Sequence, residues 1–212
     1  MKSTLVFQLG YDSDSDQEFL IKTEDIALNK SNIEKNKVTP LSVSSQVAVF
    51  TKQYEERGHE IIGLSKRYGH NIRNIPRIAD QIEPCDMFIN NAQVGYAQTE
   101  LLFEMARRWK DTGKHILIIS TMMTEFPVSV LPDMTEYWCQ KTALETAVSQ
   151  LRLRQLGIKF TIVRPGDIAT SPNKTVPPSA DVNNWAETLV KIFELTDPNL
   201  DIPDISLGPR YV

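Results

Sequence analysis

The sequence has few of the features that would tie a chain of 212 residues to a metal, a nucleic acid or a membrane. It contains only two cysteines, Cys85 and Cys139, and its three histidines are scattered, so it shows neither a metal-ligand spacing nor a disulfide framework. A formal charge of −4 argues against the concentrated basic face of a nucleic-acid binder. No apolar run reaches the length of a membrane span, and the amino terminus lacks the pattern of a secretory signal. We therefore expect a cytoplasmic protein with reduced thiols, no metal, and no nucleic-acid or membrane partner.

The sequence does contain short apolar runs that alternate with amphipathic helical patterns. Unbroken apolar runs are typical of strands buried on both faces of a parallel sheet, and here they lie at residues 3–9, 60–65, 86–90, 115–120 and 160–163. Apolar stripes with helical spacing lie between and after them, at residues 43–54, 101–109, 144–151 and 185–192. This alternation predicts an α/β fold, with one doubly wound, Rossmann-like domain over residues 1–212 and a mainly parallel sheet.

The polar stretch at residues 11–37 does not fit this alternation. It opens with the acidic run 12–16 and interrupts the expected turn from the first strand to the first helix. We interpret it as an insertion. Within it, residues 19–21 and 26–28 are compatible with a small hairpin and equally with a short helix.

Tyr137 and Lys141 form the most informative pair of residues. They stand four positions apart, so on a helix they share one face and the ammonium lies beside the phenol. A free phenol titrates near pH 10 and exchanges protons poorly at neutral pH, and a nearby cation lowers its pKa. The preceding apolar run ends in Ser120 and Thr121, whose hydroxyls are suited to hold a substrate oxygen. The pattern favours an acid–base site, although the same spacing also arises by chance on many helices.

With these segments in place, most of residues 38–212 resemble the short-chain dehydrogenase/reductase family. Residues 90–93 read Asn-Asn-Ala-Gln and look like the family's Asn-Asn-Ala-Gly strand end, with Gln93 in place of glycine. Residues 164–170 look like the Pro-Gly turn and following threonine that hold the nicotinamide end. Thr121 stands at the active-site serine position, a few residues further from the tyrosine than is usual, and the tyrosine–lysine pair matches Tyr-x-x-x-Lys. The four motifs occur in the family's order.

The resemblance implies a role for each residue of this site. Tyr137 would give a proton to the reacting oxygen or take one from it, while Lys141 lowers the pKa of the tyrosine and contacts the nicotinamide ribose. Thr121, or Ser120 if the strand end is shifted, would hydrogen-bond the oxygen of a small carbonyl or alcohol substrate. Gln98 is the residue nearest to the helix asparagine that supports a proton relay through the lysine in the family.

The resemblance also implies a nicotinamide dinucleotide. Ser65, Lys66 and Arg67 follow the second strand in place of the acidic residue that would bind a ribose 2′-hydroxyl. Two cations there suit a 2′-phosphate, which favours NADP, with NAD as the alternative. The other interpretation is that both cations are simply solvated after the strand and bind nothing. Asn71 and Ile72 stand where the family places an Asp-Val pair against adenine. The residues expected to contact the cofactor are Gly10, Ser65, Lys66, Arg67, Asn71, Ile72, Asn90, Asn91, Ala92, Lys141, Ile168 and Thr170.

The phosphate turn departs most from the family's pattern, because glycines there normally let the backbone approach the pyrophosphate. Counting back from Gly58 places the motif's threonine and glycines on Thr39, Pro40, Ser44 and Gln46, after a strand at 34–38 that is too polar for a buried sheet. We prefer residues 3–9 as the first strand, with Gly10 as the surviving glycine and residues 11–37 inserted in the loop. Aspartates in that insertion would repel a pyrophosphate unless they point outward, and a blocked turn would bind no cofactor.

Two functional hypotheses follow from these observations. The first is an NADP-dependent oxidoreductase that transfers a hydride between NADP(H) and a carbonyl or alcohol. The second is a non-catalytic binding or regulatory protein on the same scaffold that has lost dinucleotide binding. The resemblance further implies a homodimer, paired through the helices expected at about 100–110 and 136–156.

Overall fold

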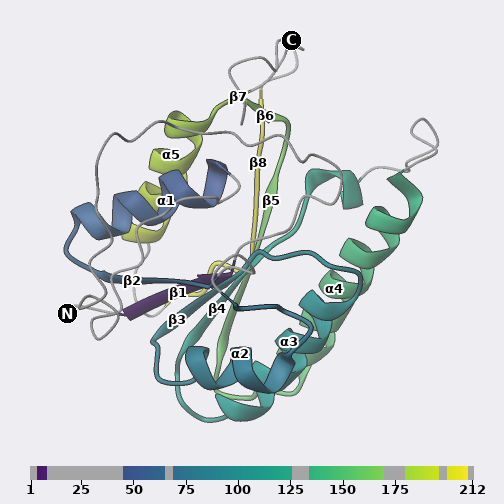
Figure 1. Cartoon of the computed structure of the whole chain (residues 1–212). Helices are drawn as coiled ribbons and strands as arrows, with labels where there is room; N and C mark the ends of the chain where they lie inside the picture. Colours follow the sequence, from purple (N-terminus) through teal and green to yellow (C-terminus); the bar gives the residue numbers. More distant parts are fainter. Residues whose placement is uncertain are drawn as a thin grey trace.

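The structure, a computed structural model, describes residues 4–8, 45–64, 69–125, 134–169, 180–195 and 200–209. A six-stranded sheet lies at its centre (Figure 1). The strands are β1 (Thr4–Gln8), β2 (Glu60–Leu64), β3 (Met87–Asn90), β4 (His115–Ile119), β5 (Lys159–Pro165) and β8 (Asp204–Leu207). Their order is β2-β1-β3-β4-β5-β8, and every neighbouring pair is parallel. The predicted α/β fold with a parallel sheet is confirmed.

The five apolar runs of the sequence are the first five strands of this sheet. Because β1 lies between β2 and β3, the register that takes residues 3–9 as the first strand is confirmed. The insertion at residues 11–37, Gly10 and the alternative strand at 34–38 all lie outside the described residues. The insertion therefore stays a prediction.

Helices cover both faces of the sheet (Figure 1). One face carries α1 (Ser45–Glu56) and α5 (Val182–Leu195), and the other carries α2 (Ile75–Ile82), α3 (Ala97–Arg108) and α4 (Thr135–Leu153). Gly58 and Gly157 follow α1 and α4 with φ of 84° and 63°, a conformation in which glycine escapes the steric cost of a Cβ. A short 3₁₀ helix η3 (Met122–Glu125) follows β4. The two-residue strands β6 (Ile168–Ala169) and β7 (Ala180–Asp181) pair beside the main sheet.

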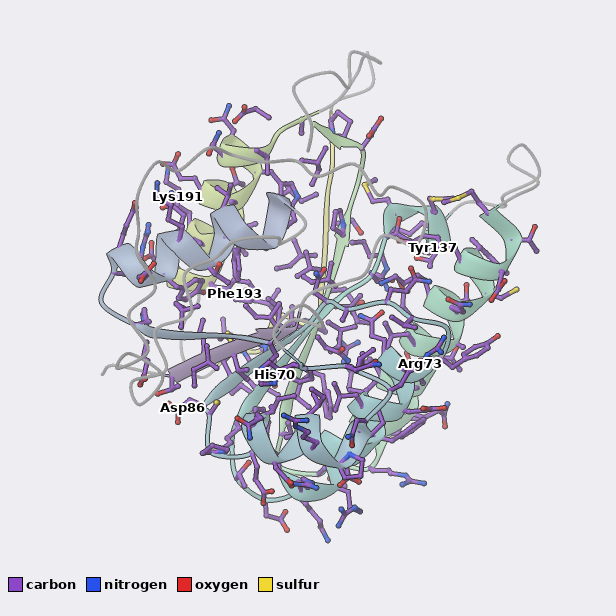
Figure 2. All side chains as sticks on the ribbon, in the orientation of Figure 1. His70, Arg73, Asp86, Tyr137, Lys191 and Phe193 are labelled. Atoms are coloured by element: carbon purple, nitrogen blue, oxygen red, sulfur yellow. The ribbon has the colours of Figure 1, made fainter. Side chains whose placement is uncertain are left out.

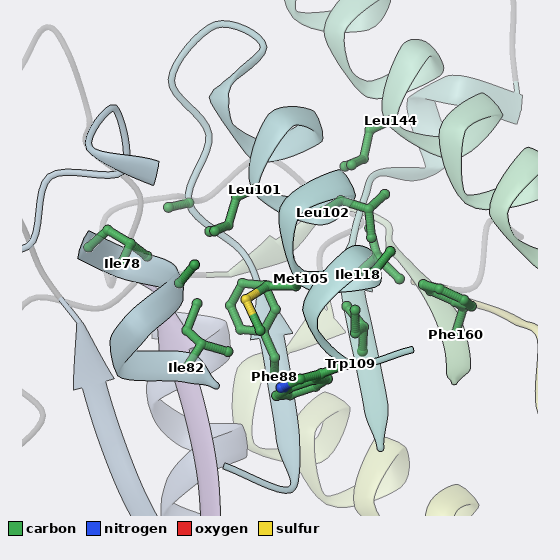
Figure 3. Close-up of a cluster of buried hydrophobic side chains, with 14 of the residues drawn as sticks. Ile78, Ile82, Phe88, Leu101, Leu102, Met105, Trp109, Ile118, Leu144 and Phe160 are labelled. Atoms are coloured by element: carbon green, nitrogen blue, oxygen red, sulfur yellow. The ribbon is translucent and has the colours of Figure 1, made fainter. Parts of the chain in front are cut away.

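The core consists of two apolar clusters, one on each face of the sheet. Along β3, Phe88 belongs to the cluster under α2, α3 and α4, whereas the next residue, Ile89, belongs to the cluster under α1 and α5. Figure 3 shows the first of these clusters, in which Met105 of α3 and Trp109, the residue that follows this helix, pack over the sheet. Successive side chains of a strand point to opposite faces, and both faces here are buried, which is why the strands read as unbroken apolar runs.

The strand order places a ligand-binding edge beyond β1 and β3. The chain moves outward from β1 to β2 and then returns to β3 on the other side, so connections leave in opposite directions between β1 and β3. Ligands of open parallel sheets bind beyond the carboxyl ends of the strands at such a point. The described residues between β2 and β3 form α2 and no strand. The sheet therefore has one strand fewer beyond β1 on this side than a Rossmann sheet of strand order 3-2-1-4-5-6.

None of the described helices is long and apolar enough to cross a membrane. Within the described part of the chain, no group of three or more histidine, cysteine or acidic side chains is placed to hold a metal ion.

Candidate active site

The candidate catalytic residues meet where β4 ends beside α4. Leu144, Val148 and Leu151 are the buried stripe of α4, and Lys141 continues that stripe one turn toward the amino terminus. Tyr137 stands one further turn along. Figure 2 shows Tyr137 near the beginning of α4, on the opposite side of the molecule from Asp86, which precedes β3. The pair therefore lies at the carboxyl edge of the sheet.

The two hydroxyls that follow β4 have different partners. A side-chain hydrogen bond joins Thr121 to Tyr137. Ser120 is buried and donates its hydroxyl hydrogen to Glu145 Oε1 instead. The structure thus brings Thr121, and not Ser120, together with the tyrosine.

The pKa of Tyr137 lies above its ordinary value of 10.0, because burial of the phenol outweighs the hydrogen bond from Thr121. This direction is opposite to our sequence-based expectation that Lys141 lowers it. Besides the burial of the phenol, the lysine is engaged by other groups: its Nζ donates to Gln98 Oε1 and to the Ile119 carbonyl oxygen, each at 2.9 Å. Nζ stands 5.7 Å from the centre of the tyrosine ring. Tyr137 consequently holds its proton at neutral pH.

Among the described residues, Lys141 is the only lysine or arginine that is buried, with 4% of its surface exposed. Burial lowers its pKa from 10.5 to about 7, and the nearby Glu145 carboxylate acts in the opposite direction. The lysine is therefore close to the midpoint of its titration at neutral pH, a property typical of proton-transfer sites.

Gln98 connects this lysine to the strand end that resembles Asn-Asn-Ala-Gly. Its side-chain Nε2 donates to the Asn90 carbonyl at 2.7 Å, and Asn90 Nδ2 donates back to the Gln98 carbonyl at 3.1 Å. Both side chains are buried. Gln98 therefore contacts the lysine directly from α3, at the place where the resemblance expected a helix asparagine.

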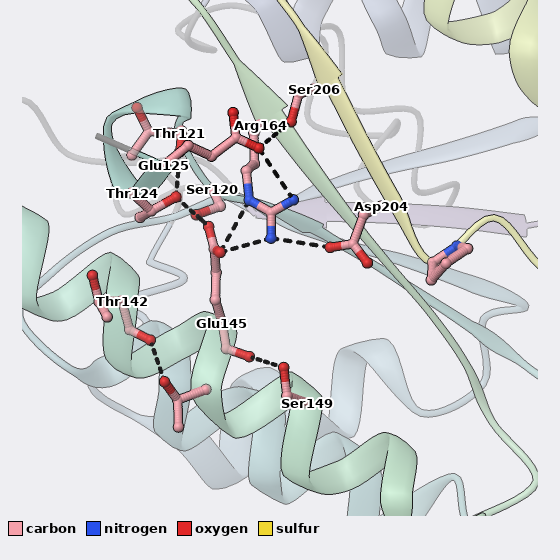
Figure 4. Close-up of polar contacts among 12 residues, drawn as sticks. Ser120, Thr121, Thr124, Glu125, Thr142, Glu145, Ser149, Arg164, Asp204 and Ser206 are labelled. Atoms are coloured by element: carbon pink, nitrogen blue, oxygen red, sulfur yellow. Dashed lines mark hydrogen bonds and ion pairs between the residues drawn. The ribbon is translucent and has the colours of Figure 1, made fainter. Parts of the chain in front are cut away.

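A charged cluster that we did not foresee adjoins the site (Figure 4). Glu145 Oε1 accepts from Ser120 and, at 2.8 Å, from Thr124. Its Oε2 accepts from Arg164 Nε and Nη2, at 3.0 and 2.8 Å. Arg164 Nη2 also lies 3.0 Å from Asp204 Oδ1. The sequence offered one signal: Glu145 stands four residues after Lys141, on the same helix face.

A second polar bridge closes beside the strand end after β3. Gln93, which replaces the family's glycine, donates to Gln140 Oε1. Gln140 is buried and donates to Glu136 Oε1 at 2.7 Å. This chain of amides fixes the loop after β3 to the first turns of α4.

The structure describes about half of the expected cofactor residues. At the carboxyl edge, Asn90 and Ala92 are buried and Asn91 is half-buried. Asn71 is exposed, whereas the Ile72 side chain packs in the apolar core. The Ile168 side chain packs in the other core cluster, which leaves its backbone as the part that a cofactor can contact. Five of the expected residues lie outside the described ones: Gly10, Ser65, Lys66, Arg67 and Thr170.

No family model and no curated protein matches the chain by sequence. Solved structures do match. A short-chain dehydrogenase/reductase from Vibrio parahaemolyticus has a TM-score of 0.63 at 14% identity, covering 79% of this chain and 97% of that one. A short chain dehydrogenase from Burkholderia cenocepacia J2315 in complex with NADP has a TM-score of 0.61 at 12% identity, covering 98% and 89%. Serine dehydrogenase from Escherichia coli has a TM-score of 0.60 at 11% identity, covering 97% of each chain. The chain thus has the fold of short-chain dehydrogenases/reductases.

Proposed function

We propose that the chain is a member of the short-chain dehydrogenase/reductase family that transfers a hydride between NADP(H) and a carbonyl or alcohol carbon. The observation that carries the proposal is the meeting of Thr121, Tyr137 and the buried Lys141 at the carboxyl edge of a parallel sheet. A protonated phenol beside a hydroxyl and a poised lysine is a general acid–base arrangement. The shared fold supports this assignment, and the NADP in the Burkholderia cenocepacia structure favours that cofactor.

The described residues fit the nicotinamide end of a dinucleotide. Asn90 Oδ1 is buried and has no hydrogen-bond partner among the described residues, which marks a polar position that a ligand can satisfy. Lys141 has three N–H groups and two acceptors in the described chain, so one N–H is left for a ribose hydroxyl. We further propose that Lys66 and Arg67 hold a 2′-phosphate and that Gly10 belongs to the phosphate turn. NADP(H), when bound, would supply or accept the hydride.

The residues of the chain would then handle the oxygen and the proton. In reduction, Thr121 donates a hydrogen bond to the substrate carbonyl oxygen and Tyr137 delivers its proton to that oxygen. A charged Lys141 stabilises the phenolate that remains. Because the pKa of Tyr137 is raised, the protonated phenol dominates at neutral pH and favours reduction. Oxidation of the alcohol needs the phenolate, so we expect it to be faster in alkaline solution.

Titration calorimetry with NADPH and NADH tests the first requirement. We expect saturable binding of NADPH, and tighter binding of NADPH than of NADH. No detectable binding at millimolar concentrations of either would remove the oxidoreductase proposal. The second hypothesis, a binding or regulatory protein on this scaffold, would then remain.

Turnover of a panel of small aldehydes and ketones, followed by loss of NADPH absorbance, tests the role of the tyrosine. Tyr137→Phe should abolish turnover and leave NADPH binding nearly intact, because only the hydroxyl is removed. Tyr96→Phe is the matched control, since Tyr96 is 51% exposed before α3 and should change neither property. Retained turnover in Tyr137→Phe would refute the role assigned to this residue.

A further inference from the structure

Glu145 is the centre of the polar cluster beside the candidate site, and both oxygens of its carboxylate accept hydrogen bonds from neighbouring side chains. One oxygen takes the hydroxyls of Ser120 and Thr124, and the other takes two N–H groups of Arg164. The side chain is only 15% exposed. Each of these three partners comes from a different element, namely the end of β4, η3 and β5. A single carboxylate on α4 therefore joins three segments around the site.

We propose that Glu145 is the positioning residue of this site, which turns Ser120 away from the reacting oxygen and holds the segment after β4 so that Thr121 faces Tyr137. This inference rests on the proposed function and extends it by assigning separate roles to the adjacent hydroxyls of Ser120 and Thr121. Ser120 cannot serve a substrate while it donates to Glu145, because a hydroxyl has one hydrogen to donate.

The rest of the cluster holds Glu145 and η3 in place. Arg164 is shared between Glu145 and Asp204 of β8, so the carboxylate cannot turn without releasing a guanidinium that is 14% exposed. Glu125, the last residue of η3, accepts from Ser206 of β8 at 2.6 Å. A partly buried ion pair held by two N–H groups, as between Arg164 and Glu145, fixes orientation more strongly than an exposed ion pair. The segment from Ser120 to Glu125 is thereby fastened to α4, β5 and β8.

Glu145 also acts on Lys141 through its charge, one turn away on the same helix. Its carboxylate raises the pKa of the lysine, against the larger lowering by burial. The other groups that face the ammonium are neutral: Tyr137 on α4, Gln98 on α3 and the Ile119 carbonyl of β4. The remaining charged groups of the cluster lie on the far side of the Glu145 carboxylate, namely Arg164, Asp204 and Glu125. Loss of the carboxylate should therefore leave Lys141 less protonated at neutral pH.

Glu145→Gln tests this role in the free protein, without cofactor or substrate. The readout is the titration of the Lys141 Nζ by nuclear magnetic resonance, in protein labelled at lysine and assigned with Lys141→Met. We expect the midpoint for Lys141 to fall in Glu145→Gln, and to lie nearer the wild-type value in Glu145→Asp, which keeps the charge. Glu104→Gln is the matched control: Glu104 is a partly buried helix glutamate that binds Arg107 and Arg108 away from the site, and its loss should not move Lys141.

An unchanged Lys141 midpoint in Glu145→Gln, or an equal shift in Glu104→Gln, overturns the proposal. If Glu145→Gln does not fold, the double variant Glu145→Gln/Arg164→Gln removes both charges together, and the same fall is expected because Arg164 lies beyond the carboxylate. Where turnover is measurable, Glu145→Gln should lower kcat by about 10- to 100-fold with little change in KM for NADPH, as misplaced catalytic groups do. Should no dinucleotide bind at all, the oxidoreductase proposal fails, whereas the titration still shows whether the Glu145 carboxylate acts on Lys141.

Discussion

Replacing Lys141 by methionine should remove most of the pH dependence of stability above neutral pH. Burial lowers the pKa of this lysine to about 7 in the folded protein, against 10.5 in an exposed chain. Between these two values the unfolded state binds more protons than the folded state, so the free energy of unfolding rises with pH. Below pH 7 both states carry the proton, and above 10.5 neither does. The stability that the protein gains when Lys141 loses its proton is therefore complete above pH 10.5, the pKa of the unfolded chain, and is lost as the pH falls to about 7.

The size of the effect follows from the gap between the two pKa values. At about 1.4 kcal/mol per pKa unit, the whole window amounts to roughly 5 kcal/mol, of which about 3 kcal/mol falls between pH 7 and about 9.5. Methionine has a similar length and no charge, so it removes the cost of burying an ammonium. It also leaves Gln98 Oε1 and the Ile119 carbonyl without a donor, at about 1–3 kcal/mol for each. The two effects nearly offset each other at pH 7, and the variant should fall behind the wild type as the pH rises.

Urea unfolding followed by circular dichroism, at several values between pH 7 and about 9.5, measures this difference. The comparison of variant with wild type cancels the titration of groups that both proteins share. Lys191→Met provides the control, because Lys191 is an exposed residue of α5 and its loss should leave the wild-type pH dependence intact. If the Lys141→Met curve runs parallel to the wild-type curve, the lysine is not titrating across this window and the reasoning is wrong.

Two further predictions concern packing and assembly. Gly166→Ala should lower the free energy of unfolding by about 1–3 kcal/mol in a thermal or urea measurement, because the added Cβ would stand 2.7 Å from Gly208 Cα and 2.9 Å from Met122 Sδ; unchanged stability would show that this contact can relax. Light scattering should find a dimer built on the groove between α3 and α4, where Phe103 is 48% exposed beside Trp138, and Phe103→Asp should shift it to monomers. A monomeric wild type would contradict this prediction.

The sequence predicts the first five strands of the sheet but not the last one, β8. The first five strands are short, unbroken apolar runs, and that signal needs no tertiary information. The edge strand β8 alternates polar and apolar residues, so it lacks the unbroken apolar run that marks the other strands. The eight-residue helix α2 is not among the predicted helices, although Pro76 in its first turn and the stripe of Ile78 and Ile82 are typical of a helix.

The site shows the same division between local and tertiary information. Tyr137 and Lys141 could be found because they lie on one helix face, and spacing along a helix is a local property. The direction of the tyrosine pKa could not be found, because it depends on how deeply the phenol is buried and on the acceptors that draw Nζ away from it. One of those acceptors, Gln98, belongs to α3 and stands 43 positions earlier in the chain.

The choice between Ser120 and Thr121 shows why adjacent candidates need a tertiary criterion. Both are hydroxyl residues at the end of one strand, and successive residues of a strand point to opposite sides, so only one of them can face the tyrosine. The sequence does not fix where the strand ends to within one residue, and a shift of one residue would exchange the roles of Ser120 and Thr121. In the fold, the carboxylate of Glu145 binds Ser120, and this interaction decides the register because it leaves Thr121 on the side of Tyr137. Under the proposed function, a residue outside the Thr121–Tyr137 pair would thus determine which hydroxyl is presented to the reacting oxygen.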